Sequence, residues 1–217
     1  GGLDALTEGR LSAAEMARLA HEVETVKLGQ QGGIQDQLAS AYGGINYIEM
    51  PQYPYATVSP IVIPEYLWYE LEQRLLLVYI GAPHNSSKVH QKVIEKLGAD
   101  ASENVWLNSL RQLAKEAKNA VFAGDFAAFG RIMNENTAIQ RCLHKDLVSE
   151  SLEDVISICG DFGALGCKVN GAGGDGGTVT VLTDRDMAKR RRLIKALNEK
   201  GYQMIPISLA RHGVRVW

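Results

Sequence analysis

Apolar residues near the start of the 217-residue chain recur at the three- and four-residue spacing of an α-helix. This spacing predicts a helix over residues 12–28, which ends at Gly29. Ser12 and Glu15 form the capping-box pattern, in which each side chain accepts a hydrogen bond from the other residue's backbone N–H at the start of a helix. The residues that share the apolar face are Met16, Leu19, Ala20 and Val23.

Shorter patterns follow this helix. A glycine-rich turn at residues 32–37 leads into a short predicted helix over 38–42, and residues 45–50 alternate in the manner of a strand. Prolines at positions 51, 54, 60 and 64 predict a series of short extended pieces. An unbroken apolar run predicts a buried central strand over 74–80. We therefore place a domain boundary near residue 70, with residues 1–70 as the first domain and 71–217 as the second.

Helical and extended patterns alternate through the second domain. This order predicts an α+β fold whose last part is a split βαβ arrangement with helices on one face. Ser86 and Ser87 are candidate caps for the first of its helices. The predicted helices cover 88–97, 104–121, 126–140, 151–162 and 186–200, and the predicted strands cover 167–170, 178–182, 202–207 and 214–217.

Charge and cysteine usage narrow the function. The net charge is −2, and the Lys-Arg-Arg-Arg cluster at 189–192 lies on a predicted helix, so we interpret it as a solvated face and expect no nucleic-acid partner. No apolar run is long enough to cross a bilayer, so we expect no membrane partner either. The three separated cysteines, Cys142, Cys159 and Cys167, predict free thiols and a cytoplasmic location.

Two carboxylates flank the first glycine turn. Glu24 lies in the last turn of the first predicted helix, and Asp36 follows the Gly-Gly-Ile-Gln segment. If the turn folds back, one carboxylate can hold Mg²⁺ while the other accepts a proton from an attacking hydroxyl. Paired glycines would let a substrate approach the backbone closely. The alternative from spacing alone is a solvated glutamate and a capping aspartate.

A second glycine cluster, Asn-Gly-Ala-Gly-Gly-Asp-Gly-Gly at residues 170–177, lies between two predicted strands. A simple hairpin needs only one or two glycines, so this density favours close approach of the backbone to a ligand. Backbone N–H groups in such a loop can form an anion nest for phosphate. The sequence lacks the Gly-Lys-Ser/Thr ending of a Walker A loop, and no helix follows as in a dinucleotide fingerprint.

These two motifs, with Tyr-Gly-Gly at 42–44, resemble those of the GHMP kinases, a family that includes galactokinase, homoserine kinase and mevalonate kinase. The leucine-rich strand at 75–79 and the Val-Arg-Val-Trp end resemble the heptose-phosphate and fucose kinase branch. The resemblance implies a C-terminal ferredoxin-like domain, the remnant of an N-terminal ribosomal-protein-S5-like domain, and a site between them.

The resemblance also implies roles for individual residues. Asp36 matches the catalytic aspartate and Glu24 matches the magnesium ligand. Asp175 stands where relatives usually have glycine, and it either faces solvent or contacts sugar hydroxyls. The turn that contacts the sugar is matched by Gly32, Gly33 and Gln35, and the loop over the phosphates is matched by Gly171, Ala172, Gly173 and Gly174.

The sequence therefore predicts an ATP- and Mg²⁺-dependent kinase that phosphorylates a hydroxyl of a sugar or sugar phosphate, such as a heptose 7-phosphate. The family's main phosphate loop is not present ahead of the helix at 12–28, so we expect a truncated form that is inefficient by itself. An Arg-Ser-Ser-like segment of the branch is replaced by His84 and Asn85 before the serines. Two alternatives stay open: a non-catalytic regulatory or dimerisation module, and a kinase for a non-sugar alcohol such as mevalonate. The sugar and a homodimer are also left open.

Overall fold

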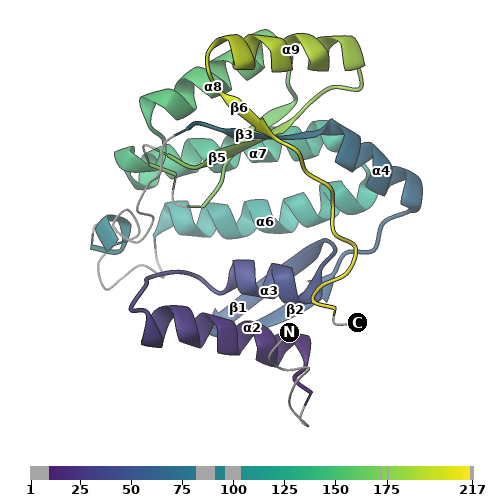
Figure 1. Cartoon of the computed structure of the whole chain (residues 1–217). Helices are drawn as coiled ribbons and strands as arrows, with labels where there is room; N and C mark the ends of the chain where they lie inside the picture. The colour runs from purple at the N-terminus through teal and green to yellow at the C-terminus, as the bar shows by residue number, and fades with distance from the viewer. Residues whose placement is uncertain (1–9, 82–90, 96–103, 172, 175, 216–217) are drawn as a thin grey trace. The chain divides into compact units, whose positions relative to one another are not determined.

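The computed structural model describes residues 10–81, 91–95, 104–171, 173–174 and 176–215 (Figure 1). The chain divides into an N-terminal unit, Gly1–Val62 with Leu209–Trp217, and a C-terminal unit, Ile63–Ser208. This division precedes the predicted boundary near residue 70, because a helix, α4 (Glu65–Arg74), runs through that position. None of the helices in the described ranges has the length and apolar character that crossing a bilayer requires.

The N-terminal unit begins with the predicted helix. Helix α2 (Ala13–Glu22) is capped as expected, because the Glu15 N–H donates to Ser12 Oγ at 3.3 Å and the Ser12 N–H donates to Glu15 Oε2 at 2.8 Å. The helix continues as a π-helical turn, η1 (Val23–Lys27), and a connection then leads to α3 (Gln35–Tyr42). The predicted start of α3 at residue 38 is therefore three residues late, and Asp36 lies in the first helical turn.

A hairpin completes the secondary structure of this unit. Strand β1 (Asn46–Gln52) pairs antiparallel with β2 (Tyr55–Pro60). The extended pieces predicted from the prolines are confirmed here, because Pro60 lies at the end of a strand in a sheet of two strands and its missing N–H breaks no central ladder. The unit's core consists of Ala17, Ile34, Leu38 and Ala41, against which Ile48 and Val58 of the hairpin pack.

The C-terminal segment returns to this unit without forming a strand. The Gly44 N–H donates to the Ala210 carbonyl at 2.7 Å, and a Cβ on Gly213 would lie 1.8 Å from the Ala41 carbonyl oxygen. The segment thus packs against the C-terminal end of α3 instead of pairing with a sheet edge. The predicted strand at 214–217 is wrong for Val214 and Arg215, and its last two residues lie outside the described ranges.

Helix α4 is the main element of the C-terminal unit that the sequence pattern missed. Pro64 occupies its N-cap, a position that requires no N–H donor within the helix, so a residue that breaks helices elsewhere begins this one. Leu67, Trp68 and Leu71 then recur at helical spacing and are buried. The predicted strand follows directly as β3 (Leu75–Tyr79).

The remaining elements follow the predicted order. Of the predicted helix at 88–97, residues 91–95 are helical, while Ser86 and Ser87 lie outside the described ranges. The other helices are α6 (Val105–Ala123), α7 (Phe126–Leu143), the 3₁₀ turn η3 (Lys145–Leu147), α8 (Glu150–Asp161) and α9 (Met187–Glu199), and the other strands are β4 (Gly166–Val169), β5 (Thr178–Leu182) and β6 (Gln203–Ile205).

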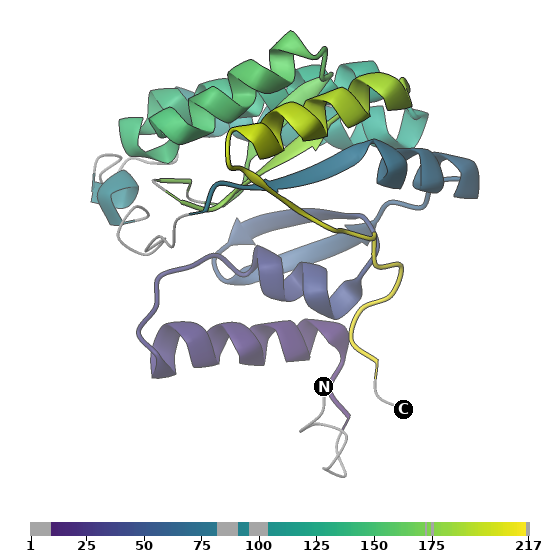
Figure 2. The ribbon, with the colours of Figure 1, turned by 45° about the horizontal axis from the view of Figure 1, so that its top comes forward.

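The four strands form an antiparallel sheet in the order β4-β5-β3-β6. Strands β3 and β4 therefore run parallel on either side of β5, and β5 and β6 run parallel on either side of β3. This is two interlocked split βαβ units, so the predicted ferredoxin-like arrangement is confirmed. Helices α8 and α9 lie across one face of the sheet, where Val155 and Leu197 are fully buried against Val78 and Val179 (Figure 2).

Helix α7 approaches β4 through two glycines. A Cβ on Gly166 would lie 2.2 Å from the Gly130 carbonyl oxygen, and a Cβ on Gly130 would lie 2.6 Å from the Leu165 backbone. The close approach lets Asn134 accept a hydrogen bond from the Cys167 N–H at 2.8 Å and lets Thr137 accept one from the Val169 N–H at 3.3 Å. The position of β4, and of the glycine loop that follows it, depends on this contact.

We expect Gly166→Ala to lower the free energy of unfolding by about 3 kcal/mol, the upper end of the usual cost of overpacking, because backbone atoms must separate. Gly160→Ala is the matched control: it lies in α8 with nothing within 4 Å of the added methyl, so it should be neutral or slightly stabilising. Urea titration followed by circular dichroism measures both. Equal stabilities for the two variants would show that the glycine contact does not limit this packing.

Candidate active site

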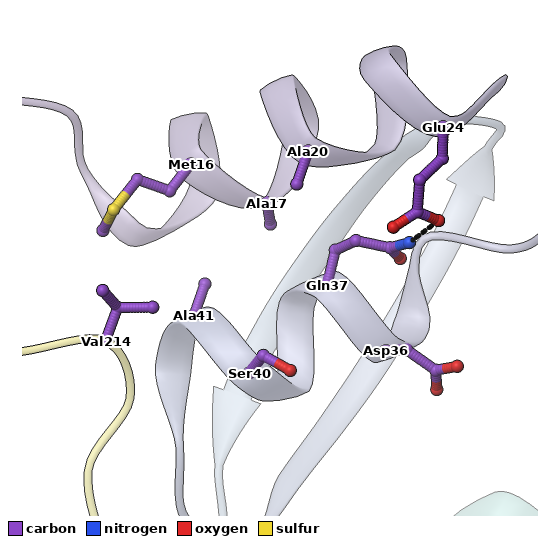
Figure 3. Close-up of a pocket in the computed structure, with 9 residues that line it drawn as sticks. All are labelled: Met16, Ala17, Ala20, Glu24, Asp36, Gln37, Ser40, Ala41 and Val214. Atoms are coloured by element: carbon purple, nitrogen blue, oxygen red, sulfur yellow. Dashed lines mark hydrogen bonds between the residues drawn. The ribbon is translucent and has the colours of Figure 1, made fainter. Parts of the chain in front are cut away.

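A groove of about 320 Å³ lies in the N-terminal unit along the contact between α2 and α3 (Figure 3). Small side chains line its middle, which lets the two helices pack closely and leaves room for a ligand at their ends. Polar side chains from both helices gather at one end, as Figure 3 shows. The lining residues are Met16, Ala17, Ala20, Glu24, Asp36, Gln37, Ser40, Ala41 and Val214.

Glu24 lies in the π-helical turn η1 and is half-buried. The widened turn is closed by backbone hydrogen bonds that span more residues than those of an α-helix. The Leu28 N–H donates to Val23 O and the Gln30 N–H donates to Glu24 O, both at 3.0 Å. A π-turn adds a residue to a helix and shifts the directions of the side chains that follow, and such turns are frequent at functional sites. The predicted position of Glu24 in the last turn is therefore correct, with a π rather than an α geometry.

Gln37 connects the two helices at the polar end of the groove. Its Nε2 donates to Glu24 Oε2 at 2.6 Å, and within the described residues its buried Oε1 has no hydrogen-bond partner. One amide group therefore positions the Glu24 carboxylate and keeps a buried oxygen without a partner among the described residues. The motif at 32–37 does not indicate a partner for Gln37, because Glu24 lies thirteen residues earlier and only the folded helices bring the two together.

Asp36 is exposed in the first turn of α3 and lines the same groove. Its carboxylate points away from Gln37, whereas the Gln37 side chain reaches towards Glu24 (Figure 3). The structure thus brings the two sequence-predicted carboxylates to one groove but holds them in different environments. Glu24 is fixed by a hydrogen bond, and Asp36 is open to solvent and to any ligand that enters from this end.

The hairpin contacts the glycine turn ahead of Asp36. The Tyr53 hydroxyl lies 2.7 Å from Nε2 of His21, which is only 4% exposed, and it donates to the Gly32 carbonyl at 3.4 Å. An Nε2–H that donates to the hydroxyl leaves the hydroxyl proton free for Gly32. Sequence reasoning gave no signal for this chain of contacts, since its three members come from α2, the turn and the hairpin.

The glycines of this first turn are not required by packing. A Cβ on Gly32 or Gly33 would meet nothing within 4 Å, and neither residue has a positive φ. Gln35, the third predicted contact of the turn, is exposed at the start of α3. The fold therefore offers no structural reason for glycine here, and the open space is compatible with the predicted contact with a substrate.

The second glycine loop, at residues 170–177, differs because packing requires glycine at one of its positions. Gly173 is buried with a φ of +59°, and a Cβ there would lie 1.8 Å from the Leu147 carbonyl oxygen. Gln140 Nε2 donates to the Gly171 carbonyl at 3.3 Å. At least one glycine of the cluster is thus required for packing against η3, which the sequence analysis did not foresee. Gly174 is also buried, and Ala172 and Asp175 lie outside the described residues.

The residues that line the groove between α2 and α3 can be compared with the ligands that Mg²⁺ requires. No three His, Cys, Asp or Glu side chains gather as metal ligands anywhere in the described residues. Mg²⁺ does not need such a cage, since it commonly uses one or two carboxylates and takes its other ligands from phosphates and water. The Glu24 carboxylate beside the unpartnered Gln37 Oε1 fits this pattern of oxygen donors.

Comparison with known proteins identifies both parts of the chain. Residues 1–44 match the GHMP kinases N terminal domain and residues 111–203 match the GHMP kinases C terminal model, together more than half of the sequence. The chain is 29% identical over 207 residues to the D-glycero-alpha-D-manno-heptose 7-phosphate kinase of Campylobacter jejuni, covering 95% of this chain and 60% of that protein.

Two further relatives extend this result. A mevalonate kinase of Thermococcus sibiricus is 28% identical over 213 residues, which cover 95% of this chain and 58% of that protein. The crystal structure of a putative sugar kinase from Campylobacter jejuni superposes with a TM-score of 0.69 at 28% identity, covering 95% of this chain and 58% of that one. The chain spans about 60% of the length of these relatives. The chain belongs to the GHMP kinase family.

Proposed function

We propose that this chain carries catalytic residues of an ATP-dependent kinase that phosphorylates a hydroxyl of a sugar or sugar phosphate. The observation that carries the proposal is the presence of Glu24 and Asp36 on one groove of a GHMP kinase chain, one carboxylate held by Gln37 and the other open to a ligand. The name of the Campylobacter jejuni relative favours a phosphorylated heptose as acceptor.

In this proposal, Asp36 accepts the proton of the acceptor hydroxyl as its oxygen forms a bond to the γ-phosphorus of ATP. The bond from that phosphorus to the bridging oxygen breaks, and ADP leaves with the electron pair. Phosphoryl transfer needs little covalent chemistry from a protein, so a base positioned for the attacking oxygen is its main direct contribution. The exposed position of Asp36 at the mouth of the groove is compatible with this role.

Glu24 and Gln37 would bind the magnesium ion that accompanies ATP. When bound, Mg²⁺ neutralises charge that develops on the phosphate oxygens. The Gln37 amide keeps the Glu24 carboxylate oriented in the absence of the metal, because the 2.6 Å bond fixes one carboxylate oxygen. The hydrogen bond from Gln37 would therefore keep the Glu24 carboxylate in position to bind the metal.

The glycines divide into two roles in the proposal. Gly32, Gly33 and Gln35 contact the acceptor, supported by the open space around both glycines. Gly171 and Gly174 belong to the loop over the phosphates, whereas the roles predicted for Ala172 and Asp175 concern residues outside the described ranges. Gly173 would act through the packing of that loop on η3, because its contact with Leu147 leaves no room for a side chain.

A non-sugar acceptor is the second candidate. The Thermococcus sibiricus mevalonate kinase resembles the chain almost as closely as the heptose-phosphate kinase does, at 28% against 29% identity. The proton-accepting role of Asp36 is the same for either alcohol. A panel of heptoses, hexoses, their phosphates and mevalonate, tested for ATP-dependent phosphorylation, separates the two candidates.

We expect Asp36→Asn in the complete protein to lower kcat by about 10²–10⁴-fold, the usual contribution of a general base, with the Kd for the acceptor nearly unchanged. ADP release in a coupled assay measures kcat, and calorimetry measures the Kd. Glu22→Gln is the control, since it removes an exposed carboxylate of α2 that does not line the groove. An unchanged kcat in Asp36→Asn would remove this residue from the mechanism.

We also expect two glycine substitutions to affect different properties, one the KM for the acceptor and the other the stability of the fold. Gly33→Ala should leave the Tm unchanged and raise the KM for the acceptor, because the added methyl meets only the space that a ligand would use. Gly173→Ala should lower the free energy of unfolding by about 3 kcal/mol, since its methyl overlaps a backbone carbonyl. Thermal unfolding and steady-state kinetics test the pair. A lower Tm for Gly33→Ala with an unchanged KM would assign that glycine to the fold.

A further inference from the structure

Lys168 is a cation in an unusual position on the central sheet. Its neighbours on β4, Cys167 and Val169, are buried in the core under α8, so strand alternation directs Lys168 to the opposite face, where it pairs in register with Thr180. The side chain is half-buried, and its Nζ donates to the Val169 carbonyl at 3.0 Å. No motif of the sequence assigns a role to Lys168.

No carboxylate of the described residues forms an ion pair with Lys168. Burial lowers the pKa of its amine, which means that the protein does not compensate the charge. Buried Arg74 differs, since its guanidinium pairs with Glu70 at 2.5 Å. A cation partly removed from water without a counter-ion is costly, so such groups are concentrated at functional sites.

The amine stands at the base of the glycine loop. Two residues after Lys168, the Asn170 side chain donates to Thr178 Oγ1 at 2.9 Å and accepts from Thr180 Oγ1 at 3.0 Å. These bonds tie together the ends of β4 and β5, between which the loop begins and returns. Gly171 and Gly174 follow with φ values of +58° and +88°, the backbone conformation found in anion-binding concavities.

We propose that Lys168, with the backbone of Gly171 and Gly174, binds a phosphate group of a substrate. The site extends the proposed kinase function, on which its biological role rests, by assigning a cation to the phosphate. A phosphate would supply the negative charge that the described surroundings of Lys168 lack. Two sources share this chemistry, namely the polyphosphate of ATP and a phosphate ester on the sugar.

The test compares Lys168→Met with the wild type in the complete protein by calorimetry. One arm titrates ATP with Mg²⁺ against adenosine, and the other titrates heptose 7-phosphate against the unphosphorylated heptose. We expect Lys168→Met to weaken one phosphate-bearing probe at least tenfold and to leave its phosphate-free counterpart unchanged; the affected arm identifies the source. Lys168→Arg should retain most of the affinity. Lys195→Met, on the exposed face of α9, removes the same charge and should change nothing.

Thermal unfolding provides the second readout. Removing an uncompensated cation should keep or raise the Tm in phosphate-free buffer, and the Tm increase on adding the phosphate-bearing probe should be smaller than in the wild type. Unchanged affinities for both probes, or a lower Tm with unchanged affinities, would overturn the site. If turnover occurs but Lys168→Met binds normally, the site alone fails. If affinity depends on Lys168 but no hydroxyl is phosphorylated, the kinase proposal alone fails.

Discussion

Ala17 and Ala41 are buried where α2 packs on α3, and this contact between small side chains fixes where the polar residues of the groove lie. Larger residues at these positions would separate the helix axes, since interaxial distance follows the size of the side chains at the contact. The 2.6 Å hydrogen bond between Gln37 and Glu24 exists only at the present separation. The prepared carboxylate therefore depends on residues that have no chemistry of their own.

Glycines in this protein fall into two groups, and the space around each glycine in the folded chain distinguishes them. Gly130, Gly166 and Gly173 are packing glycines, because a methyl on any of them would collide with backbone atoms. Gly32 and Gly33 have open space and ordinary backbone angles, so the fold does not account for them. Counting glycines in a motif cannot assign a ligand contact, whereas the space around each one can distinguish a packing requirement from a vacant surface.

The fold was predictable where local chemistry is decisive. The Ser12–Glu15 capping box and the apolar run of β3 depend on neighbouring residues, and both appear as expected. The proline pattern does not predict helix α4, because proline breaks most helices, whereas Pro64 here serves as the N-cap. The predicted strand after residue 213 failed for a tertiary reason, since Gly213 packs on Ala41.

The candidate site shows the same limit. Asp36 and Glu24 were found through their motif, but the partner that orients Glu24 is visible only after folding. Lys168 could not be identified from the sequence. A polar residue between two apolar ones is the ordinary alternation of a strand, and nothing in the sequence shows that this lysine lacks a counter-ion.

The candidate groups in the two units carry opposite charges, and phosphoryl transfer uses groups of both kinds. The N-terminal unit supplies carboxylates, which can hold a metal or accept a proton but repel a bare phosphate. The C-terminal unit supplies a cation and glycine backbone, which attract phosphate but cannot accept the proton of a hydroxyl. Within the described residues Lys168 has no carboxylate partner, so its charge is available to a phosphate, whereas the carboxylate of Asp36 is open to a hydroxyl.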